Sequence, residues 1–161
     1  MLMCFLRSAD TIPMLVDKNA IFQFIPQRPP IVMVDTLVEN TTEYSISLFQ
    51  VKADNIFVQN GAFQTPGMLE NIAQTAALRA GYGFKVQLQT TGEKFENMQP
   101  PIGFIGEVKN LIIHFLPKVG EELTTKVTLI HQVFNSSIIS GSVLVNGETA
   151  AQCEMKIFVK G

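Results

Sequence analysis

The feature that most constrains the fold is one stretch with helical periodicity between regions with strand periodicity. Small and apolar side chains recur every three or four residues over 69–80, which is the repeat of one helix face. Thr65 is expected to cap this helix, Pro66 to begin its first turn, and Gly81 and Gly83 to end it. Because most of the stripe is alanine, we expect the helix to pack closely against whatever covers it.

Both flanks of the helix have the composition and alternation of β-strands. Before it, residues 31–38 are apolar and β-branched, and residues 44–53 alternate between apolar and polar side chains. After it come four β-rich stretches: 104–115, 123–134, 137–145 and 149–159. We expect these four to form an antiparallel meander, in which Asn146-Gly147 is the clearest hairpin turn.

The remaining segments are connections. Residues 54–64 are rich in Asp, Asn and Gly and are predicted to form a loop, whereas the polar residues 84–101 predict a long connection or flap. Residues 1–24 are weakly patterned, with a short helix possible over 17–24, and are interpreted as an N-terminal extension. The length fits a single α+β domain over 1–161, with the sheet curled around the helix.

The composition excludes several classes of function. The 12 Lys and Arg are balanced by 14 Asp and Glu, with no basic run, so no nucleic-acid partner is expected. Cys4 and Cys153 are too few and too far apart for a disulfide scaffold or a zinc site. No apolar run reaches the ~20 residues of a membrane span, so we expect a cytoplasmic protein without a membrane partner. No nucleotide, flavin or metal motif is present, and no cofactor is expected.

Three segments in this element order carry a family pattern: 25–35, with its prolines and Val-Asp; 61–74, with Pro-Gly and Glu-x-x-Ala-Gln; and 115–121, with Pro-x-x-Gly-Glu. They resemble the FabZ-type 3-hydroxyacyl-acyl-carrier-protein dehydratases of the hotdog superfamily. The spacing from Gly61 to Glu70, and residues 100–106, are similar to a divergent branch, the ApeP-like dehydratases of aryl-polyene pathways.

This resemblance implies a hotdog fold, in which a curved antiparallel sheet wraps around one long central helix. It implies dehydration of a 3-hydroxyacyl thioester, held by acyl carrier protein or coenzyme A, in fatty-acid or polyene-type lipid biosynthesis. Because an isolated hotdog subunit would leave a sheet edge unpaired, we expect a homodimer whose sheet continues across the two-fold axis.

The sequence departs from the family at the catalytic histidine. The family has this histidine after a glycine just before the helix, but alanine follows Gly61 here, and residues 50–70 contain no histidine. Gln27 stands where the first segment of the family has another histidine. His114 and His131 lie in predicted strands, where a histidine is more often packed or on the surface. His114 is the better candidate for a replacement base, because the family's site lies at a dimer interface.

Water elimination requires a base for the α-proton, an acid for the leaving hydroxyl and donors for the enolate-like oxygen. Glu70 is the predicted catalytic residue, because it lies in the first turns of the helix, where the macrodipole favours a carboxylate. The amides of Gly67 and Met68 are expected to lack intrahelical partners and could hold the thioester oxygen. Gln74, one turn after Glu70, could orient its carboxylate.

Further substrate contacts are predicted on both sides of the helix. Asn60 and Gln64, with Gly61 between them, offer amide groups that can bind a substrate oxygen but cannot act as bases. Phe104 and Phe84 flank the predicted flap and are the best candidates to line an acyl tunnel, although aromatic residues here are more often core.

Two other functions remain open at this point. A hotdog thioesterase could use Glu70, with Asn60 or Gln64, to activate water or attack the thioester carbonyl. A non-catalytic acyl-binding subunit could instead have kept the tunnel, lost the base and paired with an active homologue. The missing histidine favours these two functions, whereas the proline-rich segment and the helix motif favour a dehydratase.

Overall fold

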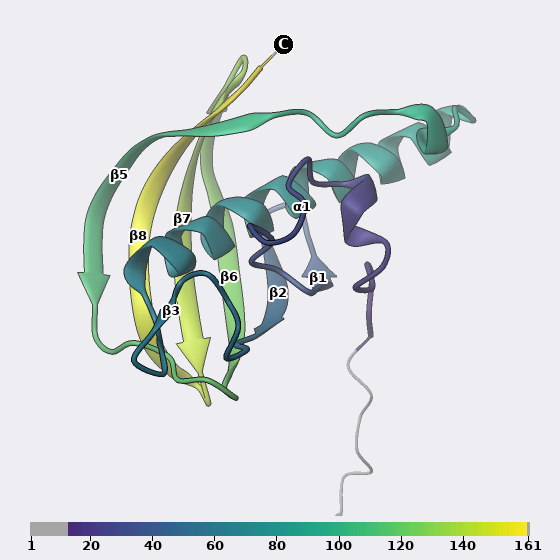
Figure 1. The fold of residues 1–161 in the computed structure, drawn as a ribbon. Helices are drawn as coiled ribbons and strands as arrows, with labels where there is room; N and C mark the ends of the chain where they lie inside the picture. Colours follow the sequence, from purple (N-terminus) through teal and green to yellow (C-terminus); the bar gives the residue numbers. More distant parts are fainter. Residues whose placement is uncertain (1–12, 161) are drawn as a thin grey trace, which may run out of the picture.

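The computed structural model describes residues 13–160. One long helix lies across the concave face of a curved sheet (Figure 1). The elements in chain order are η1 (Ile21–Gln23), β1 (Thr36–Asn40), β2 (Tyr44–Gln50), β3 (Val58–Gln59), β4 (Ala62–Phe63), α1 (Thr65–Thr91), η2 (Phe95–Asn97), β5 (Gly103–Ile113), β6 (Glu122–Val133), β7 (Ser136–Val145) and β8 (Glu148–Val159). The predicted α+β arrangement, a curved antiparallel sheet around one helix, is confirmed.

The six-stranded sheet has the order β1-β2-β6-β7-β8-β5, and every neighbouring pair is antiparallel. Only β6, β7 and β8 form a meander, so the prediction of four meander strands is wrong for β5. After η2 the chain runs back along α1 and reaches the far edge of the sheet, where β5 pairs with β8 (Figure 1). Asn146 and Gly147 have φ angles of 50° and 81° and form the predicted β7–β8 turn.

The first strand begins at Thr36, five residues later than the sequence pattern indicates. The apolar residues before it run beside α1 instead of joining a strand. The side-chain oxygen of Gln74 accepts a hydrogen bond from the Met33 amide at 2.7 Å, and the Asn71 side-chain nitrogen donates to the Met33 carbonyl at 2.7 Å. Helix side chains therefore supply the partners that a neighbouring strand would otherwise provide.

The helix is longer than predicted at its C-terminal end. Gln64, rather than Thr65, is the N-cap residue, and the helix continues past Gly81 and Gly83 to a left-handed C-cap at Gly92. Gly81 serves close packing, because a Cβ atom there would lie 3.1 Å from Cδ1 of Phe24. A glycine needed for close approach thus resembles a helix terminator in the sequence.

The buried face of α1 is partly polar and differs from the alanine stripe. Asn71, Gln74 and Thr75 all have 0% exposure. The Thr75 and Ser47 hydroxyls lie 2.7 Å apart, and the Thr125 hydroxyl donates to the Asn71 side-chain oxygen at 2.6 Å. These bonds join α1 to β2 and β6. The alanines of the helix lie on its other side: Ala73, Ala76 and Ala77 are half-buried and Ala80 is exposed, and these four residues are called the alanine stripe below.

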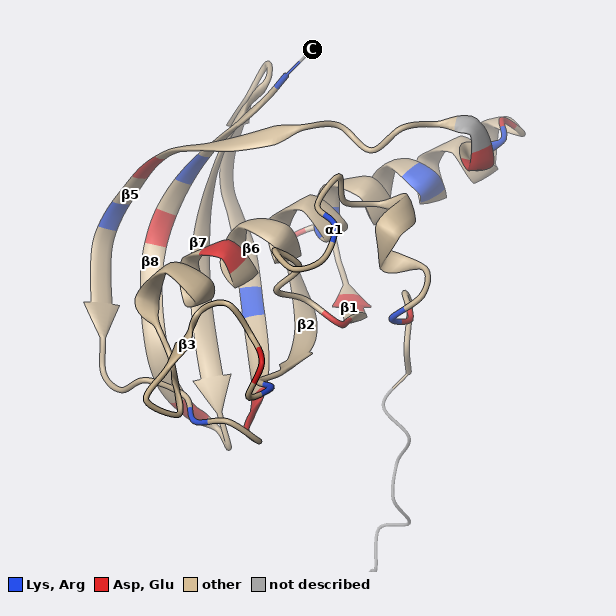
Figure 2. Cartoon of the chain, viewed as in Figure 1, with Lys and Arg blue, Asp and Glu red and all other residues tan. Residues whose placement is uncertain are grey.

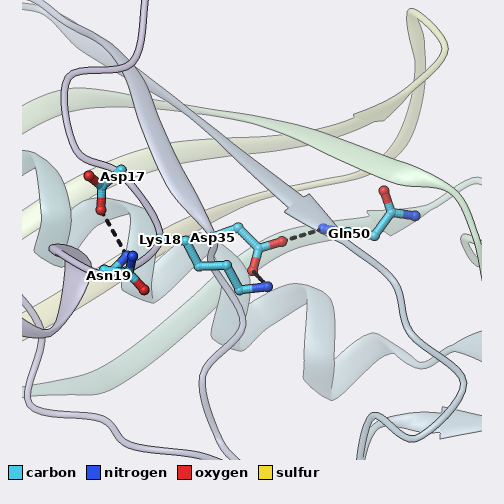
Figure 3. Close-up of polar contacts among 5 residues, drawn as sticks. All are labelled: Asp17, Lys18, Asn19, Asp35 and Gln50. Atoms are coloured by element: carbon cyan, nitrogen blue, oxygen red, sulfur yellow. Dashed lines mark hydrogen bonds and ion pairs between the residues drawn. The ribbon is translucent and has the colours of Figure 1, made fainter.

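The described part of the predicted N-terminal extension, residues 13–24, packs against the fold. Val16 bridges to Leu37, and the possible helix over 17–24 is limited to the short η1. Asp35 accepts a hydrogen bond from the Gln50 amide at 2.8 Å and forms an ion pair with Lys18 at 3.6 Å (Figure 3). Residues 1–12, with Cys4, lie outside the described residues.

Strand β5 forms one edge of the sheet and is almost entirely exposed. Its exposed apolar side chains are Phe104, Ile105, Leu111, Ile112 and Ile113. A long apolar edge strand with unpaired backbone groups is a template for pairing with another chain. Within the described range, the helices lack the combination of length and apolar character that crossing a bilayer requires.

Candidate active site

A cavity of about 510 Å³ lies between α1 and the ends of β5, β6, β7 and β8. We call it the groove. The alanine stripe and Gly83 line its helix side, and Phe104, Ile105 and Ile157 line its sheet side. The volume is within the range of small-molecule sites, about 300–1,000 Å³. The small side chains therefore leave space where larger residues would pack helix against sheet.

Glu70 is the only carboxylate among the described residues that line the groove. Its side-chain oxygen accepts a hydrogen bond from Gln74 at 3.0 Å. Gln74 also donates to the Ile31 carbonyl at 2.9 Å and accepts from the Met33 amide at 2.7 Å. The buried Gln74 side chain is thereby held in one orientation, and it can in turn hold the Glu70 carboxylate. The catalytic role of Glu70 stays a prediction.

The Gly67 and Met68 amides in the first turn of α1 are not free. The Gly67 and Met68 amides donate to the Gln64 carbonyl at 3.0 and 3.3 Å, so the expectation that they lack a partner is wrong. Neither residue lines the groove. A Cβ atom on Gly67 would lie 2.5 Å from the Phe63 ring and 2.8 Å from Cβ of Phe57. Glycine is thus required here for packing, and substrate binding by these amides stays a prediction that needs this turn to open.

The predicted loop before the helix contains a small hairpin. Asn60 and Gly61 form the turn between β3 and β4, with φ angles of 52° and 75°, and both are exposed. The Gln64 side chain donates to the carbonyls of Gln59 and Ala62 at 3.2 and 3.0 Å and braces this hairpin. None of the three predicted contact residues, Asn60, Gly61 or Gln64, lines the groove. Their role in substrate binding stays a prediction.

Two predicted aromatic residues do line the groove. Phe84 on α1 and Phe104 on β5 border it from opposite sides, and both are exposed. The two histidines are elsewhere: His114 follows β5, His131 lies on β6, both are exposed, and neither lines the groove. Within residues 13–160, the groove therefore has one acid–base candidate, Glu70, and no histidine.

Two groove residues went unrecognised as site candidates in the sequence. Gln27 is noticeable there only as a replacement for a histidine, and Arg79 has no motif around it. Both line the groove, and the side-chain oxygen of Gln27 and Nε of Arg79 are buried without a hydrogen-bond partner. For Arg79 the available signal was its position beside the alanines of α1, because residues that flank an open helix face border whatever that face contains. Gln27 precedes β1, and its sequence neighbours give no comparable signal.

The charges of the described chain are dispersed. Figure 2 shows acidic and basic residues interspersed over helix, strands and loops. Between residues 13 and 160, there is no group of three His, Cys, Asp or Glu side chains that could hold a metal ion. The described residues that line the groove can supply proton transfer at Glu70 and hydrogen bonding by amide, hydroxyl and guanidinium groups.

Known protein families and solved structures provide two comparisons for this chain. The sequence model of the ApeP-like family, described as ApeP dehydratase, matches residues 19–160. No curated protein sequence is significantly similar to the chain.

Several solved structures have a similar fold at low sequence identity. The dehydratase heterocomplex ApeI:P from Xenorhabdus doucetiae contains a chain with 13% identity and a TM-score of 0.74, covering 88% of this chain and 91% of that one. A hypothetical thioesterase with coenzyme A from Streptococcus pneumoniae has 12% identity and a TM-score of 0.56, with coverage of 78% and 84%. The PaaI protein of the E. coli phenylacetic acid degradation operon has 9% identity and a TM-score of 0.55, with coverage of 76% and 80%. These likenesses confirm the hotdog fold.

Proposed function

Because the chain belongs to the ApeP-like dehydratase family, we propose that it acts on a 3-hydroxyacyl thioester and that Glu70 transfers a proton in the elimination of water. The observation that carries this proposal is the position of Glu70. It is the one carboxylate of the described chain at a groove of about 510 Å³ that is otherwise lined mainly by small and apolar side chains. An acyl chain in the groove would bring its thioester end to this carboxylate.

The reaction removes a proton from C2 while the C2–H electron pair forms the C2–C3 double bond and the C3–O bond breaks. The departing hydroxyl must gain a proton to leave as water. Glu70 can accept the C2 proton as a carboxylate or supply a proton to the hydroxyl as a carboxylic acid, because the ionised group is a proton acceptor and the protonated group a proton donor. Gln74, bonded to Glu70 at 3.0 Å, holds the carboxylate in place.

The second proton-transfer group comes, in this proposal, from another hotdog chain. The exposed edge strand β5 supplies Phe104 and Ile105 to the groove, so a chain that pairs with β5 would border the site. A second copy is the partner that the sequence predicts. The Xenorhabdus doucetiae structure, a dehydratase heterocomplex, favours a different hotdog chain as the alternative. The acyl group would reach the site on acyl carrier protein or coenzyme A.

A second candidate function is thioester hydrolysis. The observation in its favour is that the groove has a carboxylate but no histidine among the described residues, and one carboxylate is sufficient to activate a water molecule. The fold similarity to a hypothetical thioesterase crystallised with coenzyme A is consistent with this function.

The test is a turnover assay of the full chain, alone and with a candidate partner chain. Matched 3-hydroxyacyl and saturated acyl thioesters are supplied to the wild type, to Glu70→Gln and to the control Glu148→Gln, which removes an exposed carboxylate at the start of β8. We expect enoyl product, about 100-fold less of it per unit time with Glu70→Gln, and no change with the control.

Three results would contradict the proposal. Unchanged dehydration by Glu70→Gln would remove Glu70 from the mechanism. Hydrolysis of the saturated thioester without enoyl product would favour the thioesterase. Binding of acyl analogues without turnover, alone or with a partner, would indicate a non-catalytic acyl-binding subunit.

A further inference from the structure

We propose that Arg79 binds an anionic oxygen group of the substrate and so makes the groove selective for an acyl thioester that carries such a group away from its reacting carbons. This inference rests on the proposed function, because it requires a thioester in the groove. It adds a substrate class and a specificity-determining residue to the site at Glu70.

Arg79 and Glu70 border the groove at two separate places. They are nine positions apart on α1, which corresponds to ~13.5 Å along the helix axis and about two and a half turns. They therefore flank opposite sides of the alanine stripe, and the substrate that contacts Glu70 must cross the stripe to reach Arg79. Arg79 is also the only Lys or Arg among the described groove residues.

The guanidinium group of Arg79 has more donors than partners. One terminal nitrogen donates to the Thr42 carbonyl at 2.6 Å, and Nε is buried without a partner. Ion pairs in the described chain join Lys18 to Asp35 and Lys109 to Glu107, but none involves Arg79. Arg79 is half-buried, and desolvation by this burial lowers its pKa from the ordinary value, yet an arginine stays charged at neutral pH.

A partly desolvated cation without a carboxylate is unfavourable unless something else compensates its charge. A plain alkyl chain ending at Arg79 would displace water from the guanidinium and supply no acceptor. An anionic oxygen group would supply acceptors in the planar geometry that guanidinium binds well. Gln27 and Ser137 are further polar residues in the lining of the groove.

Two parts of an acyl thioester could supply this anion. One is the phosphate of the phosphopantetheine arm on coenzyme A or acyl carrier protein. The other is a carboxylate at the far end of the acyl chain. The chemistry at Arg79 is the same in both cases, so the two sources are separated by the choice of ligand.

The experiment measures the dissociation constants of four unreactive thioether analogues by calorimetry. They combine an acyl chain ending in methyl or in carboxylate with a pantetheine arm that lacks or carries its terminal phosphate. The proteins are the full-length wild type, Arg79→Gln, Arg79→Lys and the control Lys52→Gln, which removes an exposed positive charge outside the groove.

We expect the wild type to bind one anionic analogue at least about tenfold more tightly than the neutral one. The anion that carries this preference identifies the source. Arg79→Gln should lose the preference and bind the neutral analogue at least as tightly as the wild type does, because no guanidinium is left to desolvate. Arg79→Lys should keep part of the preference, and Lys52→Gln should keep all of it. Retained binding of the neutral analogue shows that each variant is folded.

The proposal is overturned if the wild type has no preference for either anion, or if Arg79→Gln retains it. In both cases binding of the neutral analogue would leave the proposed function intact. If the wild type binds none of the four analogues, the groove is not an acyl site, and the proposed function fails together with this inference.

Discussion

Replacing Gln74 by leucine tests whether the packing of α1 also positions Glu70. The Gln74 side chain has 0% exposure and bonds to the Met33 amide, the Ile31 carbonyl and the Glu70 carboxylate. Leucine fills a similar space but makes none of these bonds. Gln74→Leu should therefore weaken both the fold and the orientation of the site.

The loss of stability can be worked out from the groups left behind. A buried donor without a partner costs about 1–3 kcal/mol, which applies to the fully buried Met33 amide. Ile31 is half-buried, so its carbonyl can recruit water and costs about 1 kcal/mol. The expected loss is about 2–4 kcal/mol, which a protein with a total stability of about 5–15 kcal/mol can tolerate while folded.

The assay pairs urea unfolding with thioester turnover and uses Thr75→Val as a matched control. Thr75 is equally buried and loses its bonds to Ser47 and to the Asn71 carbonyl, but it does not bond to Glu70. Both variants should unfold at lower urea, whereas only Gln74→Leu should also lose about tenfold in kcat. Equal losses of turnover in the two variants, or no loss of stability with Gln74→Leu, would refute this reasoning.

Three further predictions concern packing, the groove and the buried thiol. Gly141→Ala should lower the free energy of unfolding by about 1–3 kcal/mol, because the new Cβ would lie 2.4 Å from Cγ2 of Ile72. In urea unfolding, the double variant Gly141→Ala/Ile72→Ala should lose less stability than the sum of the two single losses. Ala80→Phe should change stability by less than about 0.5 kcal/mol but weaken the binding of a neutral acyl analogue, because Ala80 is exposed and lines the groove; an unchanged dissociation constant would mean that the acyl chain lies elsewhere. Desolvation, and secondarily the charge of Glu154, raises the pKa of the Cys153 thiol from 9.0 to about 11. The unfolded chain therefore loses the thiol proton at lower pH than the folded protein does, and the free energy of unfolding should fall as the pH rises from about 9 to 11. In a Cys4→Ser background, iodoacetamide should accordingly label Cys153 slowly at pH 8 until urea is added, and fast labelling of the folded protein would contradict the burial.

The sequence was sufficient for the long helix, for most of the strands of the large sheet, and for the position of Glu70 near the start of that helix. Alternation and turn residues identify β2 and β6 to β8 because these strands obey local rules. The place of β5 depends on a long return connection along α1, which no local pattern encodes. The glycines at 81 and 83 mislead because a glycine that permits close packing and a glycine that ends a helix are identical in sequence.

The site was harder to predict for a related reason. Hydrophobic periodicity assumes that the apolar face of a helix is the buried one. Here Asn71, Gln74 and Thr75 are buried because each has a hydrogen-bond partner, and the alanine face remains open as the groove. The residues that flank this open face, Arg79 among them, become visible as site residues only when the orientation of the helix is known.

The most direct measurement for Glu70 is a crystal structure of the protein, with its partner chain where one is required, bound to an unreactive 3-hydroxyacyl thioether. We predict an acyl chain along the alanine stripe, with a Glu70 carboxylate oxygen about 2.6–3.2 Å from the 3-hydroxyl group or beside C2. A ligand bound outside the groove, or a Glu70 side chain pointing away from the bound acyl group, would contradict the account.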